Sequence, residues 1–216
     1  MASPLSLIAP IAAEQATYVS TAQAARAGVD SRALARLAES GVLERALRSV
    51  YRVRAAAEPP HAELIAAWTA LADGRLPWER PPADAQPPVV VSHTAAASLH
   101  ELGTFPPARP TFIVTAPRHD PPSRAWRTFV LGLVAGEHRE HFLPQGIRLD
   151  VTTPERTLVD LAWAEADRDH VVEALADGLS RGLVDLSALR STLERRWQRR
   201  GRGTPGWFRD AVRRAA

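Results

Sequence analysis

The stretch SRALARLAESGVLERALRSVYRVR, residues 31–54, decides the fold of the N-terminal region. Its first part carries leucine and alanine at helical spacing and ends at Gly41, which predicts a short helix. Residues 42–46 and 50–53 then alternate between apolar and polar side chains, which predicts two strands joined by a tight turn. A helix followed directly by a small hairpin is therefore expected.

Two further helical patterns precede this stretch. Residues 5–16 predict a first helix, and STAQAARAG (20–28) predicts a second, with Ser20 or Thr21 as its N-cap and Gly28 as its stop. Two short helices joined by a tight turn make a helix-turn-helix, and the hairpin completes a winged helix. In that fold one helix enters the major groove of DNA, and we expect the arginines of the hairpin, or wing, to lie along the phosphates.

The candidate DNA contacts are polar positions on the third predicted helix and on the wing. The outward-facing helix positions are Ser31, Arg32, Ala35 and Arg36, and the wing arginines are Arg45, Arg48, Arg52 and Arg54. A solvated helix face would show the same pattern. We favour DNA binding because two separate elements would then converge on one surface. Tyr51 is expected to pack on the sheet.

The composition is that of a globular protein with one domain or two small ones. The chain has 216 residues, of which 45% are hydrophobic and 24% charged. It has no run of about 18 apolar residues that would predict a membrane span. It also has no cysteine, which excludes disulfides and thiolate metal sites and fits a cytoplasmic protein.

The distribution of charge is more informative than the arginine content, because all 27 basic residues are arginine, which is typical of a coding bias. Residues 1–56 have seven Arg against four acidic residues, residues 57–189 have 11 against 18, and residues 190–216 have nine against two. The basic tail is compatible with a nucleic-acid contact, a docking surface for an acidic protein, or a solvated end. Its Trp197, Trp207 and Phe208 suggest that it packs on something.

The rest of the chain predicts a second domain with a small sheet and C-terminal helices. A linker at 55–62 leads into an amphipathic helix, AELIAAWTALA, and a Pro-rich loop at 77–88. The expected strands lie in PVVVSH, RPTFIVTAP, GIRLDV and once or twice within 125–144. The expected helices are HTAAASLHELG, TTPERTLVDLAWAEA, two near 168–181 and 187–200, and a short basic one at the end. The fold class is thus α+β, with a winged helix at 1–56 and a mixed α/β domain at 57–216.

The second domain has no motif that predicts chemistry. The histidine pairs 138/141 and 93/100 lack further ligands at metal-site spacing, and no HExxH is present. The carboxylates Asp150, Glu155, Asp160 and Glu165 could suggest a nuclease. However, Glu155 suits a helix N-terminus, and Arg156 can pair with Asp160 four residues on. We expect no metal, cofactor or enzymatic activity, with a nucleic-acid enzyme kept as an alternative.

Three segments together resemble the AbiEi-type antitoxins of type IV toxin–antitoxin systems. They are STAQAARAGVDSRALARLAESGVLERALRSVYRV (20–53), VVVSHTAAASLHELG (89–103) and GIRLDVTTPERTLVDLAW (146–163). The segments follow the order of the family and span most of the chain. The last two make the similarity more specific than a winged helix alone.

The resemblance implies an N-terminal winged helix that binds inverted repeats in its own promoter and represses the operon. It also implies a C-terminal domain that counteracts a nucleotidyltransferase-like toxin. The implied DNA-binding residues are Thr21, Gln23, Ser31, Arg32, Arg36, Arg45, Arg48 and Arg52. The implied fold-making residues of the C-terminal domain are Ser92, Thr153, Pro154, Arg156, Thr157 and Asp160.

Two departures from the family pattern stand out. Ser49 occupies the wing turn where the family usually has glycine, so we expect a turn of different shape. Some members carry an appended nuclease-like domain, which is not expected here because the chain ends at Ala216. A winged-helix regulator that acts without a toxin is the main alternative.

Overall fold

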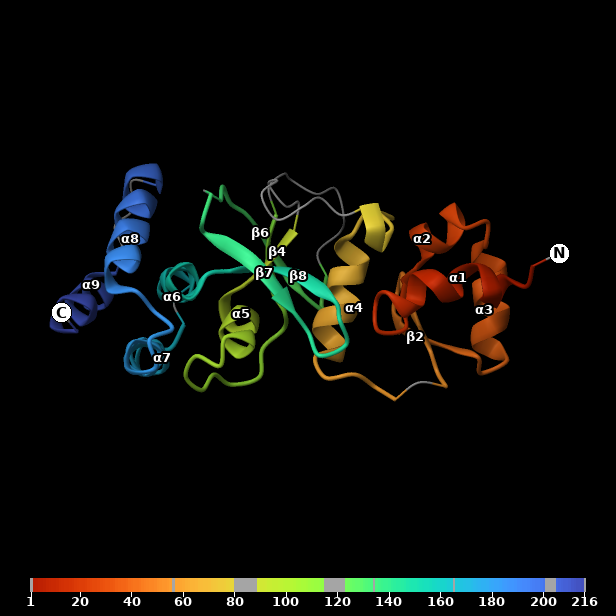
Figure 1. The fold of residues 1–216 in the computed structure, drawn as a ribbon, viewed down its shortest axis with the longest axis horizontal. Helices are drawn as coiled ribbons and strands as arrows, with labels where there is room; N and C mark the ends of the chain where they lie inside the picture. Colours follow the sequence, from red (N-terminus) through yellow and green to blue (C-terminus); the bar gives the residue numbers. More distant parts are fainter. Residues whose placement is uncertain are drawn as a thin grey trace. The chain divides into compact units, whose positions relative to one another are not determined.

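A computed structural model describes residues 2–55, 57–79, 89–114, 123–133, 135–164, 166–200 and 205–215 (Figure 1). Contacts divide the chain into two compact units. The first comprises residues 1–85, 123–125 and 141–149, and the second comprises the remainder. Within the described ranges, every helix is too short or too polar to span a lipid bilayer.

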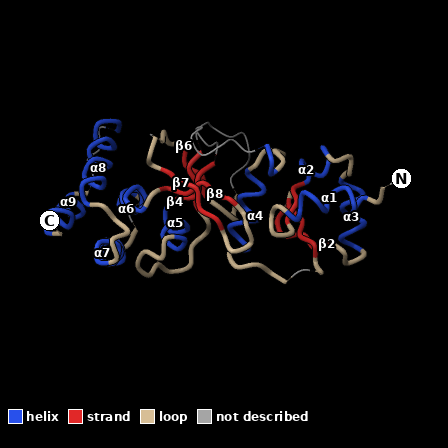
Figure 2. Tube along the Cα trace, in the orientation of Figure 1, coloured by secondary structure: helices blue, strands red, loops and turns tan. Residues whose placement is uncertain are grey.

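The first unit contains the expected winged helix. Its helices and strands in chain order are α1 (Pro4–Ala13), β1 (Tyr18–Ser20), α2 (Thr21–Arg26), α3 (Ser31–Glu39), β2 (Leu43–Leu47), β3 (Val50–Val53), α4 (Ala62–Leu71) and a 3-10 turn at Pro77–Glu79. The three strands form an antiparallel sheet in the order β1-β3-β2. Figure 2 shows strand segments of this unit in red beside its blue helices. The core beneath it joins side chains of α1, α2, α3 and the sheet, including Ile8, Val19 and Leu34.

The first strand and the end of the first helix differ from the sequence prediction. Helix α1 ends at Ala13 and not at residue 16, and Tyr18–Ser20 pair with β3 as a strand that the sequence did not predict. Ala16 and Thr17 have φ of 47° and 78° at this bend. Such conformations are uncommon for residues other than glycine, so neither residue signals a turn in the sequence.

The contacts of helix α4 place it in the first unit, whereas the sequence prediction assigned it to the second domain. It packs on all three strands of the winged-helix sheet. The sequence predicted an amphipathic helix. In the structure every residue from Leu64 to Thr69 is buried, so the helix is enclosed on all sides along this stretch. The domain boundary after residue 56 stays a prediction about which segment folds alone. The Pro-rich residues 80–88 lie outside the described residues.

The second unit is built on a five-stranded mixed sheet in the order β6-β5-β4-β8-β7. Residues 141–142 of β7 and 148–149 of β8 are grouped with the first unit. The strands are β4 (Val89–Ser92), β5 (Thr111–Val114), β6 (Arg127–Val130), β7 (His138–Phe142) and β8 (Arg148–Thr152). Strands β4 and β5 are buried along their whole length, which suits their β-branched and aromatic side chains. Strand β6 is an exposed edge.

Helices make up the rest of the second unit, as the sequence predicted. They are α5 (His93–Leu99), α6 (Pro154–Trp163), α7 (Arg168–Ser180), α8 (Leu186–Arg200) and α9 (Gly206–Arg214). Helix α6 begins with Thr153 as its N-cap and Pro154 at its first position, where its missing amide hydrogen costs no hydrogen bond. Phe208 of α9 is fully buried in the core of α6, α7 and α8, so the basic tail does pack on the domain.

Candidate nucleic-acid interface

The turn between α2 and α3 sets the direction of the candidate recognition helix. Gly28 follows α2 with φ of +83°, a conformation that glycine adopts without steric cost. Val29 is then buried, and the Asp30 carboxylate accepts a hydrogen bond of 2.7 Å from the Ala33 amide. Asp30 is therefore the N-cap of α3, and its charge complements the positive end of the helix.

Helix α3 presents the polar face that the sequence predicted. Ala33 and Leu34 are buried, whereas Ser31, Arg32 and Arg36 are exposed, as is Ala35. Arg32 and Arg36 are four residues apart, so both guanidinium groups project from the same side of the helix. Such a pair of long cationic side chains suits phosphate oxygens or the acceptor edge of guanine.

The wing turn is braced by one of the predicted contact residues. Exposed Arg45 donates to the backbone carbonyl of Arg48 from Nε at 3.2 Å and from Nη2 at 2.6 Å. The register slips by one residue between Arg45 and Leu47, and neither Arg48 nor Ser49 has positive φ. The bulge thus closes the turn without the glycine that the family usually has there, and Arg48 stays exposed at its tip.

The start of α2 is tied to the same turn. The Thr21 amide donates to the Ser49 carbonyl at 2.9 Å, and the Thr21 side chain remains half-buried. Ser20, and not Thr21, is the N-cap of this helix. Thr21 is therefore placed at a helix N-terminus next to the wing, where a hydroxyl can reach a phosphate.

Gln23, predicted as a contact, lies inside the fold. It is fully buried, and its side-chain amide donates to Gln15 Oε1 at 2.9 Å and to the Arg75 carbonyl at 2.7 Å. Gln23 Oε1 accepts a hydrogen bond from the backbone amide of Ser20, and Ser20 Oγ accepts one from the backbone amide of Gln23. This reciprocal capping box has a sequence signature, Ser-x-x-Gln, which could have indicated the structural role.

Arg52 is also turned inward. Its side chain is 9% exposed, and Nε donates to Glu44 Oε1 at 2.6 Å across the two strands of the wing. This hydrogen bond lowers the pKa of Glu44 and raises that of Arg52, so both remain charged near neutral pH. Glu44 and Arg52 are directly opposed in the register, a pairing that stabilises hairpins.

Arg26 on α2 is engaged by a neighbouring segment. Its Nη1 and Nη2 donate to the two Glu79 oxygens at 2.5 and 2.6 Å, and Nη1 also reaches the Gly74 carbonyl. Hydrogen bonds from Arg26 and from the Leu76 amide lower the pKa of Glu79 to about 2. Arg26 is thus exposed but ion-paired, and the other exposed arginines of the winged helix lie on α3, on the wing and directly after β3.

The residues assigned fold-making roles in the second unit are buried or cap helices. Thr157 Oγ1 lies 2.7 Å from Thr152 Oγ1, and Thr153 caps α6. Ser92 occupies the N-cap position of α5, but its hydroxyl bonds His93 Nδ1 at 2.8 Å and caps no backbone amide of the helix.

Arg156 and Asp160 form the ion pair along α6 that their spacing predicted, with Nε to Oδ2 at 3.0 Å. Arg156 Nη1 also donates to Glu137, and Arg196 Nη2 lies 2.9 Å from Asp160 Oδ1. Removing one member of such a buried network costs about 3–5 kcal/mol, because the remaining charges stay buried without compensation. No local pattern pointed to Glu137 or Arg196, which come from distant segments.

The histidines and carboxylates of the second unit are dispersed among structural contacts. His100 Nε2 bonds the Thr152 carbonyl at 2.7 Å, and His93 stacks on Phe129 with ring centroids 5.0 Å apart. Glu155 accepts from the Asp185 amide at 2.9 Å, and Glu165 lies outside the described residues. Among the residues that are described, no group of three or more His, Asp or Glu side chains is arranged to hold a metal ion.

Comparison with known proteins agrees with the geometry of the first unit. Residues 6–54 match a protein family described as "Transcriptional regulator, AbiEi antitoxin", from α1 to the end of β3. A comparison with curated proteins finds none that is similar. The resemblance seen in the sequence is thus confirmed for the N-terminal region, and the family description names a regulator and not an enzyme.

Proposed function

We propose that the chain is an antitoxin-type autoregulator that binds its own promoter DNA and represses the operon. The observation that carries this proposal is the exposed Ser31, Arg32 and Arg36 face of α3, within a region that matches a family of transcriptional regulators. In helix-turn-helix proteins the second helix of the motif lies in the major groove. We assign that role to α3 because Arg32 and Arg36 are exposed on it.

The proposed contact set follows the exposure of the side chains. Arg32 and Arg36 would contact base edges and phosphates. Arg45 and Arg48 would contact the DNA backbone beside the wing. Ser31 and Thr21 would contact phosphates from the N-termini of their helices. Gln23 and Arg52 are left out of this set, because their polar groups are bonded inside the unit. They would support the contact surface and not touch DNA.

Inverted repeats are the proposed operator. A single winged helix reads one half-site, so two copies of the chain would occupy one operator, with half-sites spaced by the DNA helical repeat. We also propose a cytoplasmic location, because the protein must reach its promoter DNA.

The proposed antitoxin role rests on the resemblance of the second unit, at residues 89–103 and 146–163, to AbiEi-type proteins. We propose that this unit counteracts a nucleotidyltransferase-like toxin. A winged-helix regulator without a toxin is the second candidate. The family match covers residues 6–54, the region that such a regulator would share with an antitoxin.

A promoter–reporter assay tests the regulatory part. The wild-type chain should repress a reporter driven by the DNA upstream of its gene, and Arg32→Ala/Arg36→Ala should relieve repression at equal protein level. Equal repression by both proteins would contradict the assignment. Co-expression with a nucleotidyltransferase-like gene from the same operon tests the antitoxin part, which requires restored growth. Restored growth with the α3 double variant would separate the two activities.

A further inference from the structure

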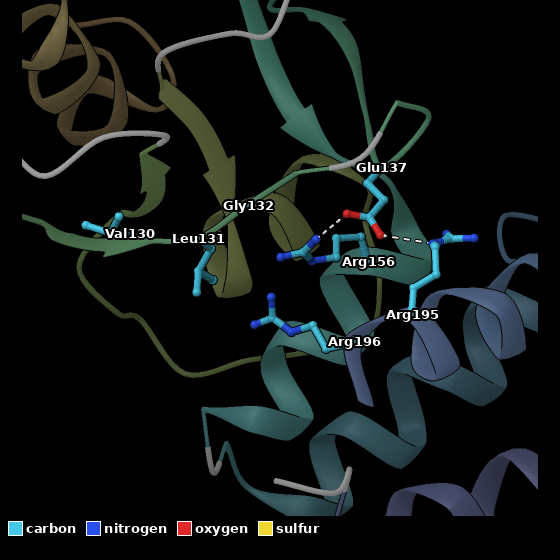
Figure 3. Close-up of a pocket in the computed structure, with 7 residues that line it drawn as sticks. All are labelled: Val130, Leu131, Gly132, Glu137, Arg156, Arg195 and Arg196. Atoms are coloured by element: carbon cyan, nitrogen blue, oxygen red, sulfur yellow. Dashed lines mark hydrogen bonds and ion pairs between the residues drawn. The ribbon is translucent and has the colours of Figure 1, made fainter. Parts of the chain in front are cut away.

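The second unit contains a small pocket lined by three arginines. Its volume is about 260 Å³, and it is lined by Glu137, Arg156, Arg195, Arg196 and residues 130–132. Figure 3 shows the guanidinium groups of Arg156 and Arg196 facing one another beside Leu131, with Glu137 between Arg156 and Arg195. The cations come from two helices, Arg156 from α6 and the others from α8.

One nitrogen of a residue that lines the pocket is buried and has no hydrogen-bond partner among the described residues. Arg156 is 1% exposed, its Nε and Nη1 donate to Asp160 and Glu137, and its Nη2 makes no hydrogen bond to any residue that the structure describes. A buried guanidinium donor that is left unpaired is costly, so native proteins satisfy nearly all such groups. An acceptor inside the pocket would supply the missing partner.

The charges around the pocket leave a positive excess. Arg156, Arg195 and Arg196 carry three positive charges, and the carboxylates paired with them, Glu137 and Asp160, carry two negative ones. Arg195 is 42% exposed, and its bonds to Glu137 and Thr192 within the described residues use Nε and Nη2. The pocket therefore favours an anion over a neutral acceptor.

We propose that this pocket binds the phosphate group of a small ligand, either inorganic phosphate or a phosphomonoester. Arginines suit phosphate because the guanidinium fork donates parallel hydrogen bonds to its oxygens. Donors that arrive from two helices match a tetrahedral dianion better than a planar carboxylate. The volume lies near the lower limit for small-molecule sites, about 300 Å³, and the apolar side chains of Val130 and Leu131 can contact the carbon part of an ester. This proposal does not depend on DNA binding.

Calorimetric titration of the full chain tests the site with inorganic phosphate, a nucleoside 5′-monophosphate and succinate as the carboxylate control. Phosphate-bearing probes should bind with Kd at or below about 1 mM, and succinate at least tenfold more weakly. Tighter binding of the monophosphate would assign the site to an ester, and tighter binding of inorganic phosphate to the free anion. Absence of binding at about 10 mM, or equal binding of succinate, would overturn the proposal.

Variants separate the pocket from general electrostatics. Arg195→Gln should weaken phosphate binding by roughly tenfold. Arg190→Gln removes the same charge from an exposed position of the same helix, and it should leave the affinity within about twofold. Arg156→Lys keeps the charge but removes Nη2, and it should weaken binding in a protein whose circular dichroism shows the native fold. Equal weakening by Arg195→Gln and Arg190→Gln would refute the site.

Discussion

Burial distinguishes residues of similar chemistry in the winged helix. Arg32 and Arg36 are exposed, whereas Arg52 is paired with Glu44 and Gln23 is enclosed. The Ser-x-x-Gln capping box indicates part of this difference in the sequence. The bond from Gln23 to the Arg75 carbonyl, 52 residues away, has no local signal.

Replacing Gln23 tests this assignment. Gln23→Ala should lower the free energy of unfolding by about 1–3 kcal/mol, because the Ser20 amide and the Gln15 side chain lose their partner in a buried site. The measurement is urea unfolding at neutral pH. Ser31→Ala, an exposed position, is the control and should change stability by less than about 0.5 kcal/mol. A stable Gln23→Ala protein with impaired DNA affinity would instead support a direct contact.

The pH dependence of stability has an identifiable contributor in His93. Burial is the main cause that lowers the pKa of His93, and Arg196 and Arg156 lower it further against the opposing effect of Asp160. Between the folded pKa and the unfolded value, about 6.5, the unfolded chain binds more protons, so stability falls as pH drops through this window.

The variant His93→Asn tests this contribution, because asparagine cannot be protonated here and tolerates the φ of +55° at this position. Unfolding at about pH 7.5 and about pH 5.5 should show a larger loss for wild type than for His93→Asn. Identical losses would show that His93 does not contribute.

At the scale of elements, α3 and the wing should contribute differently to DNA binding. Arg48→Ala should weaken binding to all sequences alike and reduce the slope of log K against log salt by about 0.9. Arg32→Ala and Arg36→Ala should also change sequence preference, by about 1–3 kcal/mol per base contact that is lost. Anisotropy titrations on operator and scrambled DNA at several salt concentrations measure both effects. A change of preference in Arg48→Ala would assign base contacts to the wing.

Most elements were predictable because they carry local signals. Helices α3 and α6 have caps, stops and apolar spacing that identify them, and the wing strands alternate as expected. Strand β1 was missed because its three residues are defined by pairing with β3, more than thirty residues later. The enclosure of α4 was missed for the same reason, since its alanines face neighbours that the local pattern does not reveal.

At the scale of the whole molecule, truncated fragments can test at which residue the N-terminal folding unit ends. Helix α4 packs on the wing sheet, and Arg75 and Glu79 bond to α2. A fragment of residues 1–79 should therefore fold cooperatively, and a fragment of residues 1–56 should be markedly less stable. Each buried large apolar side chain of α4 contributes about 1.5–3 kcal/mol. Equal thermal midpoints by circular dichroism would support the predicted boundary after residue 56.

The pocket of the second unit also depends on the whole fold, because its charged residues come from separate segments of the chain. Arg156 and Asp160 were predictable as a pair from their spacing, but Glu137, Arg195 and Arg196 reach them from other segments. Only the assembled fold brings the five charged groups together, so the sequence indicated a stabilising role for Arg156 and no binding site.

The affinity of the full chain for the DNA upstream of its gene tests the central claim most directly. It should be measured with excess nonspecific competitor at low and moderate salt, for wild type, Arg32→Ala/Arg36→Ala and the matched control Arg127→Ala/Arg168→Ala, whose two arginines are exposed outside the winged helix and the basic tail. The account predicts salt-sensitive binding that survives competitor, falls by about 10²-fold or more in the α3 variant and stays within about threefold in the control. Absence of specific binding by wild type, or equal losses in both variants, would contradict recognition of DNA by α3.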